Sequence, residues 1–276
     1  MEINFSKMHG LGNDFVVIDA INQEINLTAA QIRFIADRHF GVGCDQLLLV
    51  ENPVQPNADF KYRIFNADGG EVAQCGNGAR CFMRFVRDKQ LSDKSQIVVD
   101  TDAGQLVLSL DAQGLVTVNM GVPLHEPKQI PLLMPEHAKL YTTYIDAKQI
   151  EFSAVSMGNP HAVIQVSDIA RAPLISVGAK MEHHPLFPAR ANIGFMEVIN
   201  RQAIKLRVYE RGAAETLACG SGACAAVVIG VELGLLDHVV CVSLPGGDLQ
   251  INWLGRGQPV FMVGPAVLVY EGKIQL

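Results

Sequence analysis

Two cysteines of this chain lie in copies of one short pattern. Residues 71–79 and 215–223 both read E-x-x-x-C-G-x-G-A, and their cysteines, Cys75 and Cys219, are 144 residues apart in a chain of 276. A thiolate can accept a proton and a thiol can donate one. Two cysteines on opposite faces of one carbon could therefore remove a proton from one side and return a proton to the other, which inverts that carbon.

The glycines around each cysteine predict a tight turn that leads into a helix. Such a turn leaves backbone N–H groups uncovered, and the start of a helix adds a partial positive charge. These features favour binding of a carboxylate and are expected to lower the pKa of a thiol beside them. Each loop would then combine a base with an anion site, which suits proton removal from a carbon next to a carboxylate.

Other interpretations of the two loops remain open at this point. Either loop alone is also typical of a buried structural cysteine in a strand-to-helix turn. A metal site and a redox dithiol are further alternatives, although the sequence has no C-x-x-C pair and no histidine at zinc-finger spacing. Nothing in the sequence indicates a bound cofactor, so we expect none, and no metal.

Further polar residues recur at nearly the same offset as the cysteines. Asn13 matches Asn159 and Gln46 matches Asn192, each 146 residues later, whereas the match of Asn66 is Glu210, 144 residues later. Several matches in the same order predict a duplicated unit with polar residues at corresponding loop positions. Two such units would aim both cysteine loops at one shared site, where the guanidinium of Arg211 could hold a carboxylate in a fork.

The expected elements follow the same duplication. In the first half, strands are expected at residues 3–8, 15–19, 47–50 and 62–65, before a helix at about 77–89. The capping-box pattern from Thr28 to Gln31 predicts a further helix. In the second half, strands are expected at residues 150–155, 162–166, 193–198 and 203–209, with a helix near 173–181 and another after Cys219. Prolines at residues 121–131 mark the boundary between a domain of residues 1–119 plus 264–276 and a domain of residues 120–263.

The composition excludes several classes of function. The chain is 49% hydrophobic, which is ample for packed cores, and has a net charge of −6 without a Lys/Arg run, so nucleic acid and membranes are not expected partners. Residues 218–236 are nearly all apolar, but they contain Glu232 and lack flanking anchors, which favours a buried helix. We expect no signal peptide, reduced cysteines and a cytoplasmic location.

Residues 66–80 and 210–222 resemble the two signature motifs of the diaminopimelate epimerase family, and the segments 8–15 and 158–161 match it as well. The resemblance extends over nearly the whole chain. Gly70 and Ala214 depart from the family pattern, which usually has Ser and Gly at these positions. The resemblance implies an α/β (α+β) fold of two pseudo-symmetric domains, each a mixed, mostly antiparallel β-sheet or barrel wrapped around a central helix.

The resemblance also implies a reaction and a set of site residues. The reaction is cofactor-independent interconversion of LL- and meso-2,6-diaminopimelate, a step in lysine and peptidoglycan precursor synthesis. Cys75 and Cys219 would be the acid–base pair, tuned by His161 and Glu210. The residues expected to bind the substrate are Asn13, Gln46, Asn66, Gly76, Asn77, Asn159, Asn192, Glu210, Arg211, Gly220 and Ser221. A homodimer is expected, with Tyr270 at its interface.

Two alternatives to this function carry different sequence signals. Proline racemases and hydroxyproline epimerases share the two-cysteine plan, but their first loop typically reads Cys-Gly-His-Gly, whereas this chain has Asn77 at the third position. From a different class, a thiol- or zinc-binding protein without catalytic activity would also contain paired cysteines. A metal assay and an activity test with a chelator distinguish the latter.

Overall fold

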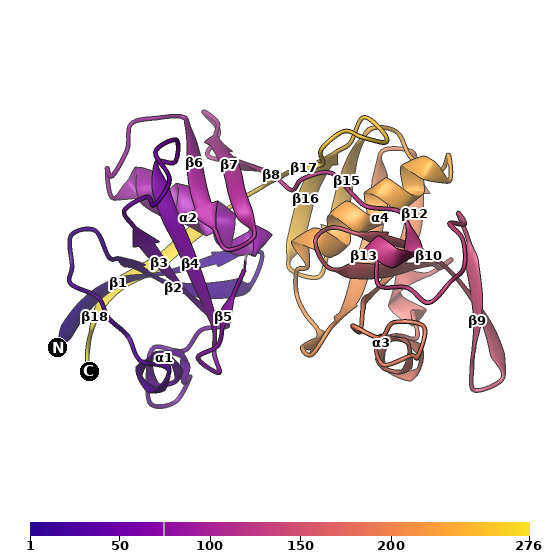
Figure 1. Cartoon of the computed structure of the whole chain (residues 1–276), viewed down its shortest axis with the longest axis horizontal. Helices are drawn as coiled ribbons and strands as arrows, with labels where there is room; N and C mark the ends of the chain where they lie inside the picture. Colours follow the sequence, from indigo (N-terminus) through magenta and orange to yellow (C-terminus); the bar gives the residue numbers. More distant parts are fainter. Residues whose placement is uncertain (74) are drawn as a thin grey trace. The chain divides into compact units, whose positions relative to one another are not determined.

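The chain divides into two compact units, Met1–Asn119 with Val263–Leu276, and Met120–Met262 (Figure 1). The computed structural model describes residues 1–73 and 75–276. Gln74, a variable position of the first repeated motif, lies outside the described residues. The chain leaves the first unit once and returns to it, because the last fourteen residues complete that unit.

The first unit is a curled, mostly antiparallel sheet. Its strands follow the order β18-β1-β2-β3-β4-β6-β7-β8, in which only the β2–β3 and β4–β6 neighbours are parallel among the described pairings. The two-residue strand β5 (Glu71–Val72) pairs with the end of β4. The other bounds are β1 (Glu2–Gly10), β2 (Asn13–Asp19), β3 (Gln46–Glu51), β4 (Phe60–Asn66), β6 (Gln96–Thr101), β7 (Gly104–Leu110), β8 (Val116–Asn119) and β18 (Val267–Gln275).

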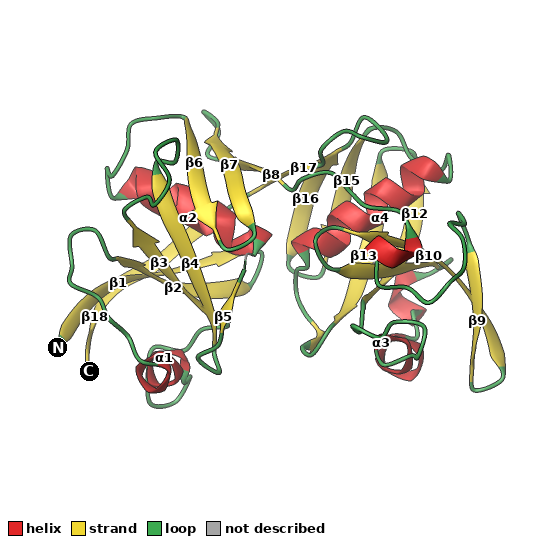
Figure 2. Ribbon diagram, viewed as in Figure 1, coloured by secondary structure: helices red, strands yellow, loops and turns green. Residues whose placement is uncertain are grey.

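Helix α2 (Gly76–Asp88) forms the centre of this unit. It contacts β1, β2, β3, β7, β8 and β18, and Figure 2 shows strands around it. Its apolar side chains, such as Phe82 and Val86, are fully buried, which stabilises the helix through packing more than through local propensity. Helix α1 (Ala29–Ala36) begins with the predicted capping box, since Gln31 N–H donates to Thr28 Oγ1 and Thr28 N–H donates to Gln31 Oε1.

The second unit repeats this plan. Its strands follow the order β9-β10-β11-β12-β13-β15-β16, with β11–β12 and β13–β15 parallel, and β14 (Ala214–Glu215) pairs with the end of β13. Helix α4 (Gly220–Glu232) contacts β10, β11, β12, β13 and β16. The strand bounds are β9 (Tyr141–Ile145), β10 (Lys148–Ser156), β11 (Pro160–Gln165), β12 (Asn192–Asn200), β13 (Ala203–Glu210), β15 (Val239–Leu244) and β16 (Gly247–Asn252). The boundary between the two units falls within β17 (Phe261–Gly264).

The strand registers confirm the duplication. Phe15 pairs with Gln46 across the parallel strands β2 and β3, and His161 pairs with Asn192 across β11 and β12, at the same offset of 146 residues. Likewise Phe65 is opposite Glu71 and Tyr209 is opposite Glu215, both 144 residues apart. The predicted fold class, two related units that each have a mixed sheet around a central helix, is confirmed.

Some elements differ from the predictions. Strand β9 was not predicted, and the helix expected near residues 173–181 consists of a π-helical turn, η3 (Leu174–Gly178), and a short α3 (Ala179–Glu182). Two 3₁₀ turns, η1 (Pro127–Gln129) and η2 (Ile169–Arg171), complete the second unit. Helix α4 ends before the apolar run does, because Gly234 adopts a positive φ of 74° that terminates a helix.

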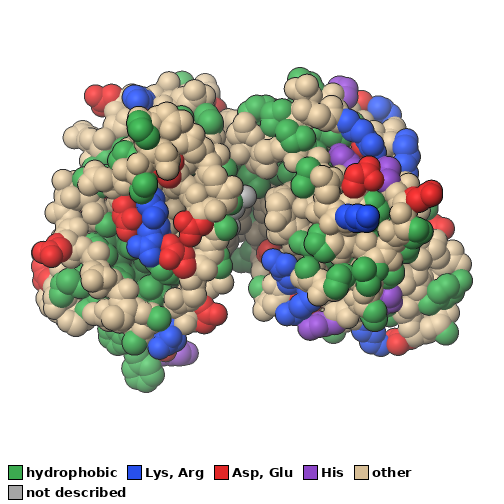
Figure 3. Space-filling view, in the orientation of Figure 1, with side chains coloured by type: hydrophobic (Ala, Val, Ile, Leu, Met, Phe, Trp, Pro, Cys, Tyr) green, Lys and Arg blue, Asp and Glu red, His purple; other side chains and the backbone are tan. Residues whose placement is uncertain are grey.

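The surface carries charged side chains of both signs, as the absence of a Lys/Arg run in the sequence suggests. Lys and Arg side chains are interspersed with Asp and Glu on the face shown in Figure 3. Among the described residues, no helix is both long enough and apolar enough to cross a membrane.

Candidate active site

A buried tyrosine, Tyr62, donates a hydrogen bond to the backbone of the first cysteine loop. Cys75 is the N-cap residue of α2 in extended conformation, and its carbonyl accepts hydrogen bonds from Ala79 N–H at 2.8 Å and from the Tyr62 hydroxyl at 3.2 Å. Tyr62 is 1% exposed on β4 and its ring packs edge-on against Phe82. Burial raises the pKa of Tyr62, so its hydroxyl remains a donor. Sequence reasoning missed Tyr62, whose only signal was its place in the strand before the loop.

Two of the predicted substrate-binding residues lie beside Cys75. Asn13 Oδ1 is 3.8 Å from Cys75 Sγ and accepts a hydrogen bond from Asn77 Nδ2 at 3.2 Å. The Asn77 side chain is buried, and its Oδ1 accepts from Arg80 Nη1 at 3.0 Å. Arg80 is fully buried and also donates from Nε to the carbonyl of Pro265. The Asn77 side chain therefore fixes the loop, while the first turn of α2 supplies the backbone N–H groups.

Asn13 is in turn oriented by an ionic network that the sequence analysis did not identify. Its Nδ2 donates to Asp45 Oδ2 at 3.0 Å, and Arg38 bridges Asp45 and Asp14 at 2.8 Å each. Lys7, which is buried, contacts Asp14 from the other side. Burial opposes ionisation of Asp14, but hydrogen bonds from Arg38 and Lys7 outweigh it and hold the pKa of Asp14 well below its usual range.

Gln46 and Asn66 form a pair on neighbouring strands. They are opposite each other in the β3–β4 ladder, and Gln46 Nε2 donates to Asn66 Oδ1 at 2.8 Å. Both side chains are half-buried, Gln46 at the start of β3 directly after a loop and Asn66 at the end of β4 directly before one.

The second cysteine loop has a carboxylate in contact with the sulfur. Cys219 is the N-cap residue of α4, and its Sγ donates to Glu210 Oε2 at 3.0 Å and lies 3.8 Å from Ser221 Oγ. The hydroxyl of Thr216 contacts the other carboxylate oxygen of Glu210. The structure therefore brings Cys219, Glu210 and Ser221 together, as the sequence analysis expected.

The prediction that the helix start lowers the pKa of the thiol is wrong for Cys219. Burial raises the pKa of Cys219 well above its ordinary value, and the nearby Glu210 carboxylate raises it further. The Gly222 N–H and the Ser221 hydroxyl lower this pKa, but they do not compensate. The position of Cys219 at a helix N-terminus suggested a thiolate. The carboxylate of Glu210 and burial of the sulfur instead stabilise the thiol.

His161 and Asn159 continue the chain of contacts from Cys219. Asn159 Nδ2 donates to Ser221 Oγ at 3.4 Å, and its Oδ1 accepts from His161 Nε2 at 3.0 Å. His161 is buried, which lowers its pKa to about 3, and the charge of Arg211 acts in the same direction. His161 is therefore neutral and orients Asn159 rather than adding a charge.

Asn192 and Arg211 are also brought together, but mainly through the backbone. The buried Asn192 donates from Nδ2 to the Pro160 carbonyl at 3.2 Å and accepts from Arg211 N–H at 2.9 Å. Its side chain thus ties two loops to each other. The exposed Arg211 side chain donates from Nη1 to the carbonyl of Ala189 at 3.0 Å.

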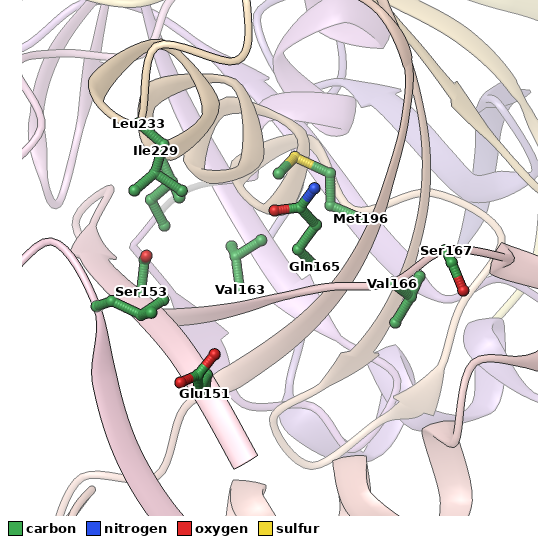
Figure 4. Close-up of a pocket in the computed structure, with 10 residues that line it drawn as sticks. Glu151, Ser153, Val163, Gln165, Val166, Ser167, Met196, Ile229 and Leu233 are labelled. Atoms are coloured by element: carbon green, nitrogen blue, oxygen red, sulfur yellow. The ribbon is translucent and has the colours of Figure 1, made fainter.

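Other candidate features lie apart from these loops. A cavity of about 380 Å³ in the second unit is lined by residues of β10, β11, β12 and α4, among them Glu151, Val163 and Ile229 (Figure 4). None of its lining residues is a predicted site residue. Within residues 1–73 and 75–276, no group of three or more His, Cys, Asp or Glu side chains is placed to hold a metal ion.

The remaining cysteines differ in their exposure. Cys44, Cys81 and Cys224 are buried. Cys241 is exposed, because it lies on an outward-facing position of β15 between the buried Val240 and Val242.

Comparisons with known proteins identify the family of this chain. The sequence model described as "Diaminopimelate epimerase" matches residues 5–125 and 153–269. A protein of that name from Teredinibacter turnerae is 58% identical over 276 residues, all of both chains, and one from Nitrosospira multiformis is 56% identical over all of this chain and 99% of the relative.

Solved structures with low sequence identity share the fold. A hydroxyproline epimerase from Agrobacterium vitis, with bound trans-4-hydroxy-L-proline, has a TM-score of 0.70 at 15% identity and covers 99% of this chain and 92% of its own. A PhzF-family phenazine biosynthesis protein from Bacillus anthracis has a TM-score of 0.71 at 16% identity and covers all of both chains. The matched sequence model and the full-length relatives show that this chain belongs to the diaminopimelate epimerase family.

Proposed function

We propose that this protein is a cofactor-independent epimerase that interconverts LL- and meso-2,6-diaminopimelate. The observation that carries the proposal is the pair of cysteine loops, each at the start of a buried central helix and at matching positions of the duplicated fold. The family relatives at 56% and 58% identity are named for the same activity. As part of this proposal, the protein acts in lysine and peptidoglycan precursor synthesis and is located in the cytoplasm.

The proposed reaction is a proton exchange between two sulfurs and one carbon. In one direction the Cys75 thiolate removes the α-proton and becomes a thiol, while the Cys219 thiol donates its proton to the opposite face and becomes a thiolate. The reverse reaction exchanges these roles. Backbone N–H groups of Gly76, Asn77, Gly220 and Ser221 would stabilise the charge that develops on the α-carboxylate.

The surroundings of Cys219 support these roles. With Glu210 Oε2 at 3.0 Å, the thiol form is favoured, so Cys219 is ready to donate a proton. Once it has done so, the adjacent carboxylate makes the thiolate a stronger base, which favours proton removal in the reverse direction.

The remaining predicted residues would bind the two amino-acid ends of the substrate. We propose that Arg211 holds the carboxylate of the non-reacting end, because a guanidinium can grip both oxygens. The amides of Asn13, Gln46, Asn66, Asn159 and Asn192 would complete the site, with Asn192 acting through the loops that it ties together. We propose that the site is assembled from the domain of residues 1–119 plus 264–276 and the domain of residues 120–263.

Incubation with LL-diaminopimelate in D₂O tests the function. We expect formation of the meso isomer with deuterium at the inverted α-carbon. Because general acid–base catalysis contributes about 10²–10⁴-fold, Cys75→Ser and Cys219→Ser should each lose at least about 100-fold in turnover. The exposed Cys241→Ser is the matched control and should retain full activity.

Other outcomes of this experiment would exclude the proposal. Turnover of proline or hydroxyproline, but not of diaminopimelate, would assign the protein to the related racemases. Zinc bound to the purified protein, together with no turnover of any of these substrates, would support the zinc-binding alternative. Near-normal turnover of either serine variant would show that the two cysteines do not form the acid–base pair.

We further propose that the protein forms a homodimer through β18. Four consecutive apolar residues of this strand, Val267, Leu268, Val269 and Tyr270, are 37–54% exposed, so both faces of this part of the strand are uncovered. Exposed apolar patches of this kind favour association. Sedimentation should show a dimer that Tyr270→Ala weakens, whereas Phe40→Ala, which removes an 82% exposed aromatic ring elsewhere, should not. A monomeric wild-type protein would contradict this assignment.

A further inference from the structure

The glutamate that opens each repeated motif forms the same ion pair in both units. Arg63 Nε and Nη2 donate to the two carboxylate oxygens of Glu71 at 2.6 and 2.9 Å. In the second unit, Arg207 Nε and Nη2 donate to the two oxygens of Glu215 at 2.7 and 2.9 Å. Both members are displaced by 144 residues, the offset that also relates Cys75 to Cys219.

The strand register explains why this pair forms twice. Glu71 is opposite Phe65 and Glu215 is opposite Tyr209, and each arginine lies two residues earlier on the same face of its strand. An arginine at that position is a diagonal neighbour of the glutamate, within reach of a long side chain. The bidentate ion pair therefore occurs twice because β4–β5 and β13–β14 have the same strand register.

Each ion pair holds the strand that leads into a cysteine loop. The strands β5 and β14 contain only two residues each, so few backbone hydrogen bonds fix them. The cysteine follows the glutamate after four residues in both units. A bidentate arginine on the glutamate therefore restricts the direction in which the chain enters the turn before the helix.

The arginines are themselves anchored to other elements. Arg63 Nη1 donates to Glu51 of β3 at 3.2 Å, and its guanidinium lies 4.9 Å above the Phe65 ring. Arg207 Nη1 donates to the carbonyl of Ile169 at 3.2 Å. Hydrogen bonds from Arg63 lower the pKa of Glu71, and the hydrogen bonds that Arg207 donates to Glu215 raise the pKa of Arg207. Each pair thus connects the strand before a cysteine loop to a second element of its unit, β3 in the first and η2 in the second.

We propose that Glu71 and Glu215 are positioning residues that, through Arg63 and Arg207, hold Cys75 and Cys219 in the geometry for proton transfer. This inference rests on the proposed two-cysteine function. The side chains are about one-third exposed, 30% and 32% in the first pair and 28% and 37% in the second, so the pairs contribute little to overall stability. Their effect is on the placement of the two sulfurs.

The chain offers a matched control for the experiment. Arg84 Nε contacts both carboxylate oxygens of Asp88 at 2.9 Å, with exposures of 37% and 30%, but this pair lies at the far end of α2 from Cys75. Glu71→Gln and Glu215→Gln are therefore compared with Asp88→Asn. The rate of alkylation by iodoacetamide is followed for each cysteine by mass spectrometry across pH, and kcat and KM are measured with diaminopimelate.

We expect each glutamine variant to change the alkylation rate of its own cysteine and not that of the other. Because displacement of a reacting group by about 1 Å can cost about 100-fold, kcat should fall by about tenfold or more, with a smaller change in KM. Asp88→Asn should leave both readouts unchanged. Should Glu71→Gln fail to fold, Arg63→Lys, which keeps the charge but loses the fork, should give the same selective effect on Cys75.

Two results would overturn the inference. One is an alkylation profile and kcat of Glu71→Gln and Glu215→Gln that match those of Asp88→Asn. The other is an equal effect of each variant on both cysteines, which indicates general loosening of the fold. Since alkylation requires no substrate, absence of diaminopimelate turnover in the wild-type protein would refute the proposed function without affecting this test.

Discussion

At the scale of single residues, the two cysteines share a sequence context but differ in their electrostatic surroundings. Cys75 faces the neutral amide oxygen of Asn13 at 3.8 Å, whereas Cys219 donates to the Glu210 carboxylate at 3.0 Å. The repeat position that holds Asn66 in the first unit holds Glu210 in the second, and only the second of these side chains can carry a charge. Burial and the Glu210 carboxylate raise the pKa of Cys219, so the proton affinity of this thiol depends on a residue outside the repeated loop.

Replacement of that carboxylate should change the titration of Cys219 in a defined direction. Glu210→Gln removes a negative charge that raises the pKa of Cys219, so the pKa should fall and the thiolate should form at lower pH. The pH dependence of Cys219 alkylation measures this shift. Glu151→Gln, at an exposed position of β10, is the control. An unchanged or raised pKa in Glu210→Gln would show that Glu210 does not control the proton affinity of Cys219.

At the scale of elements, the turn between β13 and β14 contains a strained residue. Ala214 has a positive φ of 59°, in the left-handed region that favours glycine, and it stands where the related family usually has Gly. The turn is short, because Glu210 is the last residue of β13 and Ala214 is the first of β14. The family departure noted in the sequence therefore has a local conformational cost in the loop that leads to Cys219.

Ala214→Gly should relieve this cost. A left-handed conformation costs an L-residue about 1–2 kcal/mol, and the added flexibility of glycine in the unfolded chain offsets about 0.5–1 kcal/mol. We expect a net gain of up to about 1.5 kcal/mol in the free energy of unfolding, measured by urea denaturation. Ala30→Gly in the exposed part of α1 should instead lose about 1 kcal/mol. A similar loss in both variants would contradict the assignment of strain to Ala214.

At the scale of the whole molecule, the fold supplies one cysteine loop per unit and leaves the other thiols in different environments. Burial raises the pKa of Cys44 to about 11 and that of Cys81 to about 12, which disfavours their thiolates. Cys241 is exposed and can react alone at the surface. Under the proposed mechanism, only Cys75 and Cys219 approach the same substrate carbon.

Mild oxidation should therefore inactivate the enzyme through one disulfide. Two sulfurs at about 3–3.5 Å from one carbon lie about 6–7 Å apart, and a modest motion in the empty site would bring them to the roughly 2 Å of a disulfide. We expect a Cys75–Cys219 bond by peptide mapping, recovery with reductant and protection by a substrate analogue. Cys241→Ser should be inactivated at the wild-type rate. A dominant disulfide between another pair would refute the shared site.

The sequence by itself determined the features that depend on local pattern. The spacing of Cys75 and Cys219, the glycines beside them and the apolar runs after them were sufficient to predict the duplication, the two central helices and the family. The capping box at Thr28 is of the same kind, since its hydrogen bonds join residues three positions apart. The capping box could be predicted because its interacting groups are close together along the chain. The duplication could be predicted because its matching residues are separated by a nearly constant 144–146 residues.

Only the tertiary structure decided the surroundings of each sulfur. The contact of Tyr62 with the Cys75 backbone, the network that orients Asn13 and the ion pairs of Glu71 and Glu215 join groups on different elements. The raised pKa of Cys219 likewise depends on burial and on Glu210, so the local rule for helix N-termini gave the wrong sign. Strand register and packing bring these groups within hydrogen-bond distance, and proton affinity depends on such distances and on exclusion of water.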